Sequence, residues 1–165
     1  MIRPLASEEF DMKRVFKTVV LVLAIVFIAA QFYRPDRTTA PIVQAETLEA
    51  ATTVPANVAR VLNRSCNDCH TNQTNYPWYS NVTPVNWLLA SHIDEGRRKM
   101  NFSIWNTYDA KRKARKLDQI CDQITGGEMP HFQYLWMHAD AKLSDDDKRL
   151  LCDWEQAERA RISGS

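Results

Sequence analysis

Apolar residues recur along most of the chain with the spacing of helices, and no segment alternates as a half-buried strand would. Proline and glycine mark where the expected helices begin and end, and Ser144 is a favourable N-cap residue. The pattern predicts an all-α domain with short helices and long loops. We expect four helices in it, over residues 55–66, 84–96 and 109–125 and from residue 144 onward.

A long apolar run near the N-terminus has a different character. Residues 18–33 contain no charged side chain, and basic residues precede them. Counted from Val15, the run is long enough, at about 1.5 Å per residue, to cross most of a roughly 30 Å hydrocarbon layer. We therefore expect residues 1–33 to comprise a cytoplasmic N-terminus and one transmembrane anchor. Residues 15–33 would contact the lipid bilayer, and the rest of the chain would be exported.

A cleaved signal peptide is the alternative for this run. Signal peptidase requires small residues at positions −3 and −1 of the cut. Cleavage after Ala30 would place Ile28 at −3, and cleavage after Ala29 would place Phe27 there, so a retained anchor is favoured. Residues 34–53 then form a flexible tether, because Pro35 and Pro41 interrupt any helix, and the folded domain spans residues 54–160.

The strongest chemical signal is the stretch Cys66-Asn67-Asp68-Cys69-His70. A Cys-x-x-Cys-His motif is the attachment signature of c-type haem: both thiols form thioethers, and the histidine binds the iron. A zinc site would need four ligands, but the other cysteines, Cys121 and Cys152, lie far from the motif and from each other. A thioredoxin-like site would need a βαβ pattern, which is absent. We therefore predict one covalent haem c.

Several further segments join the motif in a family resemblance. The chain resembles a membrane-anchored class I c-type cytochrome, and within that group the bacterial haem-binding-domain family, over roughly residues 55–157. The resemblance implies a small cytochrome c-like helical domain around one haem. It also implies electron transfer on the periplasmic side of the bacterial inner membrane by a single-pass protein, in a respiratory or photosynthetic chain. The matching segments are residues 66–74, 76–80, 84–89, 95–97, 101–103, 127–130 and 143–145, with Trp154.

The sixth iron ligand is expected to be Met129. It follows a glycine pair and precedes Pro130, so it belongs to an irregular loop rather than to a core-facing helix stripe. A thioether opposite His70 is a ligand pair of electron-carrying cytochromes. His131 is the main competitor because it lies on the same loop. The remaining candidates are His92, His138, Met100 and Met137.

Net charge and the distribution of basic residues bear on partners. The chain has a formal net charge of +1, which gives no argument for binding nucleic acid. The expected partner is a membrane-embedded or periplasmic redox protein or complex. The basic residues of segment 111–116 form an ordinary solvated helix face, or they steer an acidic partner. An oxidising exterior permits a disulfide between Cys121 and Cys152, and two small buried thiols are the slightly favoured alternative.

Three classes of function remain, and electron transfer without catalysis is favoured. A haem peroxidase would need an open iron position with an acid–base group beside it, which His131 could supply only if Met129 does not bind. A haem sensor or a structural subunit of a membrane complex is the third class. In each class, six aromatic residues are expected to form walls around the haem: Trp78, Tyr79, Trp87, Phe102, Trp105 and Trp136.

Overall fold

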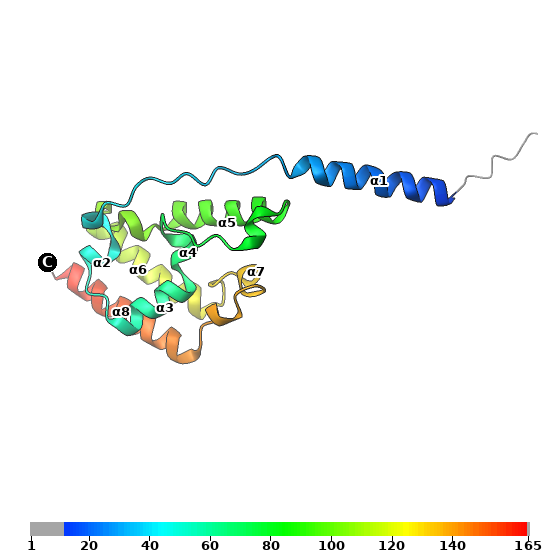
Figure 1. Cartoon of the computed structure of the whole chain (residues 1–165). Coiled ribbons are helices and arrows are strands. Elements are labelled where there is room, and N and C mark those ends of the chain that lie inside the picture. Colours follow the sequence, from blue (N-terminus) through cyan, green and yellow to red (C-terminus); the bar gives the residue numbers. More distant parts are fainter. Residues whose placement is uncertain (1–11, 165) are drawn as a thin grey trace, which may run out of the picture. The chain divides into compact units, whose positions relative to one another are not determined.

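The computed structural model describes residues 12–164, and these residues contain helices and turns but no strand. The prediction of an all-α fold is confirmed. Figure 1 labels the helices. The chain divides into two compact units. The first comprises the described residues up to Asp36 together with Pro77–Leu89. The second comprises Arg37–Tyr76 and the chain from Ala90 onward.

The predicted transmembrane helix is wrong. Among residues 12–164, no helix combines the length and the apolar character that a membrane crossing requires. Helix α1 runs from Met12 to Ala30, so its first half carries Lys13, Arg14 and Lys17 and it ends before Tyr33. Its uncharged part is roughly 20 Å long, short of a ~30 Å hydrocarbon layer. The single-pass inner-membrane location and the bilayer contact through residues 15–33 are corrected with it. Residues 1–11 lie outside the described part.

The residues that follow α1 are hydrogen-bonded to the other segment of the first unit. The side-chain amide of Gln31 accepts from the backbone N–H of Thr83 at 3.0 Å and donates to its carbonyl at 3.3 Å. The indole N–H of Trp87 donates to the carbonyl of Tyr33 at 2.9 Å. The segment Pro77–Leu89 contains the 3-10 helix η2 (Trp78–Asn81) and the first residues of α5 (Val85–Lys99).

The second unit holds the remaining helices, of which α3, α6 and α8 are the longest. The four predicted helices are present as α3, α5, α6 and α8. Their starts follow local rules: the Asp109 side chain caps α6, and Ser144 and Asp147 form a reciprocal capping box at the start of α8. The elements are η1 (Gln44–Glu46), α2 (Leu48–Ala51), α3 (Ala56–Ser65), α4 (Asn67–His70), η3 (Phe102–Thr107), α6 (Ala110–Thr125), α7 (Phe132–Leu135), η4 (Ala139–Ala141) and α8 (Asp145–Ser163).

The hydrophobic core of the second unit is built from the apolar stripes of α3, α6 and α8. Each stripe follows the three- and four-residue spacing that the sequence shows. Two aromatic residues of η3, Phe102 and Trp105, complete this core rather than standing outside it. The buried stripe residues are Val58, Val61, Leu62, Leu117, Ile120, Ile124, Leu151 and Trp154.

The segment expected to be a flexible tether contains ordered structure. Leu48 in α2 has no exposed surface and belongs to the core. The hydroxyl of Thr39 donates to the carbonyl of Asn72 at 3.1 Å, and the amide of Asn106 donates to the carbonyl of Ala45 at 3.1 Å. Isolated threonine and alanine residues without periodicity gave no sign of this packing. The folded second unit therefore begins before residue 54.

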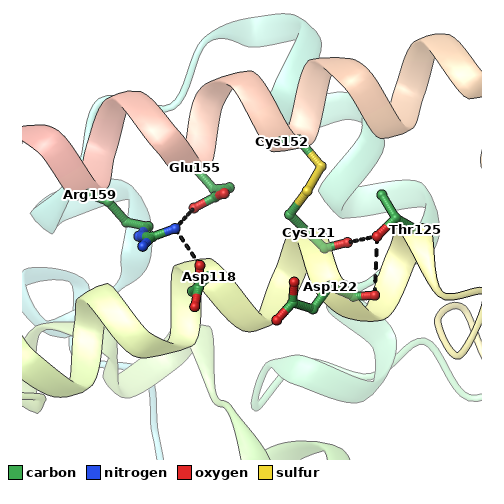
Figure 2. Close-up of a disulfide and its surroundings, with 7 residues drawn as sticks. All are labelled: Asp118, Cys121, Asp122, Thr125, Cys152, Glu155 and Arg159. Atoms are coloured by element: carbon green, nitrogen blue, oxygen red, sulfur yellow. Dashed lines mark hydrogen bonds and ion pairs between the residues drawn. A yellow bond between two sulfur atoms is a disulfide. The ribbon is translucent and has the colours of Figure 1, made fainter.

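A disulfide joins α6 and α8, which lie side by side (Figures 1 and 2). Cys121 and Cys152 have Cα atoms 5.0 Å apart, so the expectation of two free thiols is wrong. Both residues flank the buried stripes of their helices, and flanking positions of two packed helices meet. Arg159 adds a polar link, since it pairs with Asp118 on α6 and lies 3.7 Å from Glu155 on its own helix.

Candidate functional site

The Cys-x-x-Cys-His motif forms a single helical turn. Cys66 ends α3, and the next four residues are α4. The backbone N–H groups of Cys69 and His70 both donate to the carbonyl of Cys66, at 3.2 and 3.0 Å. Residues three positions apart on such a turn share one face. The two thiols therefore lie on the same side, and neither is part of a disulfide.

Both thiols are protonated at neutral pH. Burial raises the pKa of the Cys66 thiol to about 12 and that of the Cys69 thiol to about 11. Redox-active cysteines have lowered pKa values, and zinc binds the thiolate. No group of three or more His, Cys, Asp or Glu residues that could hold a metal ion occurs among residues 12–164. The alternatives of a zinc site and a thioredoxin-like site gain no support.

The orientation of His70 is fixed by a backbone carbonyl. Its Nδ1 lies 2.9 Å from the carbonyl oxygen of Met100, and a carbonyl only accepts, so Nδ1 carries the proton. This leaves Nε2 as the unprotonated nitrogen, the form that binds a metal. Burial lowers the pKa of His70, against the opposing effect of hydrogen bonds to backbone carbonyls. The lowered pKa favours the neutral ring, which is the form that can bind iron.

Gly96 lets α5 approach the turn of residues 66–70, which we call the attachment turn after the motif that it carries. A Cβ atom at this position would lie 2.7 Å from the carbonyl oxygen of Cys69 and 3.2 Å from its Cβ. These distances leave no room for any side chain. The approach brings the carbonyl of Met100, one turn further along, within reach of His70. Gly96 is therefore a structural requirement of the site.

Arg97, the next residue of α5, stabilises the end of the attachment turn. Its Nε donates to the carbonyl of Thr71 at 2.7 Å, and its Nη2 donates to the hydroxyl of Thr74 at 2.9 Å. Thr71 is the C-cap of α4, so its carbonyl has no partner within that helix. The guanidinium supplies the missing donor and fixes the chain that follows His70.

Met129 lies on a short loop after α6. Gly127 turns the chain with φ of 78°, a conformation that favours glycine. The backbone N–H groups of Glu128 and Met129 then donate to the carbonyl of Gln123, at 2.9 and 3.2 Å. The Met129 side chain keeps 37% of its surface exposed, so it is not a core residue. The loop leads through His131 into α7.

The competing ligand candidates have contacts of their own. The ring of His131 lies 4.7 Å from that of His92 on α5, and its buried Nδ1 has no hydrogen-bond partner. His138 stacks on Tyr134 with ring centroids 4.2 Å apart. Met100 packs against the core, and Met137 is 56% exposed. His131 is thus the candidate nearest to Met129 along the chain that retains an unsatisfied ring nitrogen.

The aromatic residues expected around a haem have different positions. Trp105 is fully buried in the core, and the buried ring of Phe102 lies 5.9 Å from that of His70. Trp136 is 71% exposed and contacts Phe132. Trp78, Tyr79 and Trp87 belong to the first unit. In the second unit, Phe102 is the aromatic residue in contact with the histidine of the motif.

A polar cavity of about 720 Å³ lies beside the attachment turn. Asn67 and Asp68 line it, together with amide and hydroxyl side chains, whereas the two thiols and His70 do not. A porphyrin requires mostly apolar walls. This cavity is therefore not the expected haem site.

The donor set of the turn fits a covalently attached haem. Two protonated thiols share one face, and the adjacent imidazole has its metal-binding nitrogen unprotonated and its other nitrogen bonded. Sequence reasoning missed the supporting roles of Gly96, Arg97 and the Met100 carbonyl. One signal was available: a glycine inside a helix costs about 1 kcal/mol relative to alanine and often marks a close approach. It was interpreted as the end of that helix instead.

We expect Gly96→Ala to destabilise the holoprotein by about 1–3 kcal/mol and to lower its haem content, because the added methyl group collides with the Cys69 carbonyl. Chemical denaturation and the ratio of haem to protein measure the two effects. Gly164→Ala is the matched control, since a Cβ there meets its nearest atom at 3.4 Å. Unchanged stability and haem content in Gly96→Ala would contradict the close approach.

Comparison with known proteins agrees with the chemistry of the turn. The model of a family described as haem-binding domain matches residues 25–157, which is more than half of the chain. Comparison with curated proteins gave no match, and comparison with solved structures gave none. The chain therefore belongs to the haem-binding domain family.

Proposed function

We propose that this haem protein is a monohaem c-type cytochrome that carries electrons. Cys66 and Cys69 would attach the haem by two thioethers, and His70 and Met129 would bind the iron. The observation that carries the proposal is the 2.9 Å hydrogen bond from His70 Nδ1 to the Met100 carbonyl, which leaves Nε2 for iron. When bound, the iron supplies a one-electron couple between ferric and ferrous forms.

The surroundings of the site favour electron transfer over catalysis. The His70 ring is held by the Met100 carbonyl, and the backbone N–H of Met129 is bonded to the Gln123 carbonyl in α6, so each proposed ligand has one fixed support. Ligands supported in this way would allow a bound iron to change oxidation state with little rearrangement of the protein. The disulfide between Cys121 and Cys152 supports folding in an oxidising compartment.

A haem peroxidase is the second candidate, and one observation favours it. His131 has a buried ring nitrogen without a partner and lies against His92. A histidine beside an open iron position can move protons to and from a bound peroxide. This function requires that Met129 does not bind the iron, so the ligand test below separates the two candidates.

The proposed attachment predicts that acid–acetone will not extract haem from the unaltered protein. Cys66→Ala or Cys69→Ala should leave one thioether, and the double variant should leave none. Haem staining of denaturing gels and the position of the pyridine haemochrome band measure the number of thioethers. Cys121→Ser is the control, because that cysteine belongs to the disulfide. Complete extraction of haem from the unaltered protein would refute covalent attachment.

The proposed sixth ligand predicts a low-spin ferric protein with a thioether-to-iron charge-transfer band. Met129→Ala should abolish the band, open the iron to carbon monoxide and lower the potential by about 0.1 V or more, within the ~0.8 V over which axial ligands set haem potentials. His131→Ala should leave the band unchanged. A bis-imidazole spectrum in the unaltered protein would instead favour His131, and a high-spin ferric protein would favour the peroxidase.

We propose that the electron partner presents an acidic surface. The basic residues of α6 are accompanied by Lys99 from the end of α5, and the positive charge of Lys116 acts on His70. Burial lowers the pKa of Lys116, as do the neighbouring charges of Arg115, Arg112 and Lys99. Among the described residues, none of the basic side chains of segment 111–116 forms an ion pair with a carboxylate. A concentrated charge of one sign steers an oppositely charged partner.

The basic residues of segment 111–116 and Lys99, which we call the basic face, predict a charge-dependent rate of electron transfer. Oxidation of the ferrous protein by hexacyanoferrate(III), an anion, should slow roughly tenfold or more between low and high salt, as expected for electrostatic steering. Oxidation by a cationic cobalt(III) complex should become faster. Lys116→Glu should slow the anionic reaction at low salt, whereas Arg60→Glu on α3 should change it little. Stopped-flow absorbance measures each rate, and equal salt dependence for both oxidants would exclude steering by this face.

A further inference from the structure

We infer that the hydrogen bond between Asp68 and Tyr134 positions the Met129 loop against the haem attachment turn. The inference rests on the proposed function, since it assigns a role toward the sixth ligand. Asp68 lies within the Cys-x-x-Cys-His motif, and Tyr134 lies in α7, five residues after Met129. The Tyr134 hydroxyl donates to Asp68 Oδ2 at 2.9 Å. This bond joins the two chain segments that carry the proposed iron ligands.

Asp68 is held firmly enough to act as an anchor. Its backbone carbonyl accepts from the Thr74 hydroxyl at 2.6 Å, and its Oδ1 accepts from the backbone N–H of Asn75 at 3.1 Å. Thr74 is bonded in turn by Arg97, which also holds Thr71. Both carboxylate oxygens are therefore occupied, and Oδ2 is directed at Tyr134. With its backbone carbonyl and its Oδ1 both held, Asp68 presents Oδ2 to Tyr134 in a fixed position.

The Met129 loop needs an anchor at its C-terminal end. Its N-terminal end is bonded to the carbonyl of Gln123 in α6, and α6 is fixed to α8 by the disulfide. Its C-terminal end is α7, a four-residue helix whose backbone bonds are local. A single helical turn is not stable by itself. The ring of His131 also contacts His92 on α5, but a hydrogen bond to a carboxylate is directional and a ring contact is not.

Loss of the hydrogen bond between Asp68 and Tyr134 should therefore weaken the iron–Met129 bond without removing the ligand. A loop anchored at one end samples positions in which Met129 is displaced, and an added ligand competes better with it. Removal of one hydrogen bond to a charged acceptor should raise the apparent affinity for an added ligand by about tenfold. Asp68 and Tyr134 act here as positioning residues.

The experiment uses ferric holoprotein and imidazole as the competing ligand. Tyr134→Phe, Asp68→Asn and the double variant are titrated with imidazole, and the thioether-to-iron band is followed. We expect each single variant to bind imidazole about tenfold more tightly, and the double variant to differ little from either single variant because both remove one interaction. Tyr76→Phe is the matched control: its ring lies 4.4 Å from the Arg37 guanidinium, and its hydroxyl has no hydrogen bond among the described residues.

The outcomes separate this inference from the proposed function. If the unaltered protein lacks the band, or if Met129→Ala retains it, Met129 is not the ligand and both fall. If Met129→Ala abolishes the band but Tyr134→Phe binds imidazole like the unaltered protein, only the positioning role of the Asp68–Tyr134 hydrogen bond is overturned. Additive effects of the two single variants overturn that role as well. Should Asp68→Asn impair haem attachment, Tyr134→Phe decides alone, with faster hydrogen exchange of the α7 amides as its second readout.

Discussion

The contact between α5 and the attachment turn is the constraint on which the site depends. Gly96 allows the helix to reach the Cys69 carbonyl, and the same approach delivers the Met100 carbonyl to His70 and the Arg97 guanidinium to the end of the turn. These contacts are made by the last turn of α5 and by Met100, the residue that follows it, so they form or fail together. The turn alone, with four residues, could not hold a histidine in a fixed orientation.

Local sequence patterns predicted much of the fold because they act over short distances. The stripes of α3, α6 and α8 follow from residue spacing, and the cap at Ser144 follows from residue type. The N-terminal helix was misjudged because hydropathy was counted from Val15 to Tyr33, whereas the helix ends at Ala30 and includes three basic residues. The disulfide depends on the register of two packed helices, which no single-helix pattern specifies.

The candidate site was predictable only where chemistry is encoded in adjacent residues. The motif identified Cys66, Cys69 and His70 as candidate haem-binding residues, and the glycine pair indicated that Met129 lies on a loop. The supports of the site come from residues some thirty positions away, such as the Met100 carbonyl, which any residue type could supply. A backbone carbonyl that accepts a hydrogen bond cannot be identified from residue types. Gly96 is visible in the sequence, but a glycine that permits close packing cannot be distinguished there from a glycine that ends a helix.

The two cysteine pairs of the chain differ in oxidation state for a physical reason. Cys121 and Cys152 are joined, whereas Cys66 and Cys69 remain reduced. Thiol–disulfide exchange requires a thiolate, and with pKa values of about 12 and 11 the motif thiols hold little of it at neutral pH. The fold thus slows attack by these thiols on the disulfide that fixes α6 to α8. Burial of the motif therefore keeps its two thiols apart from the disulfide chemistry that joins α6 to α8.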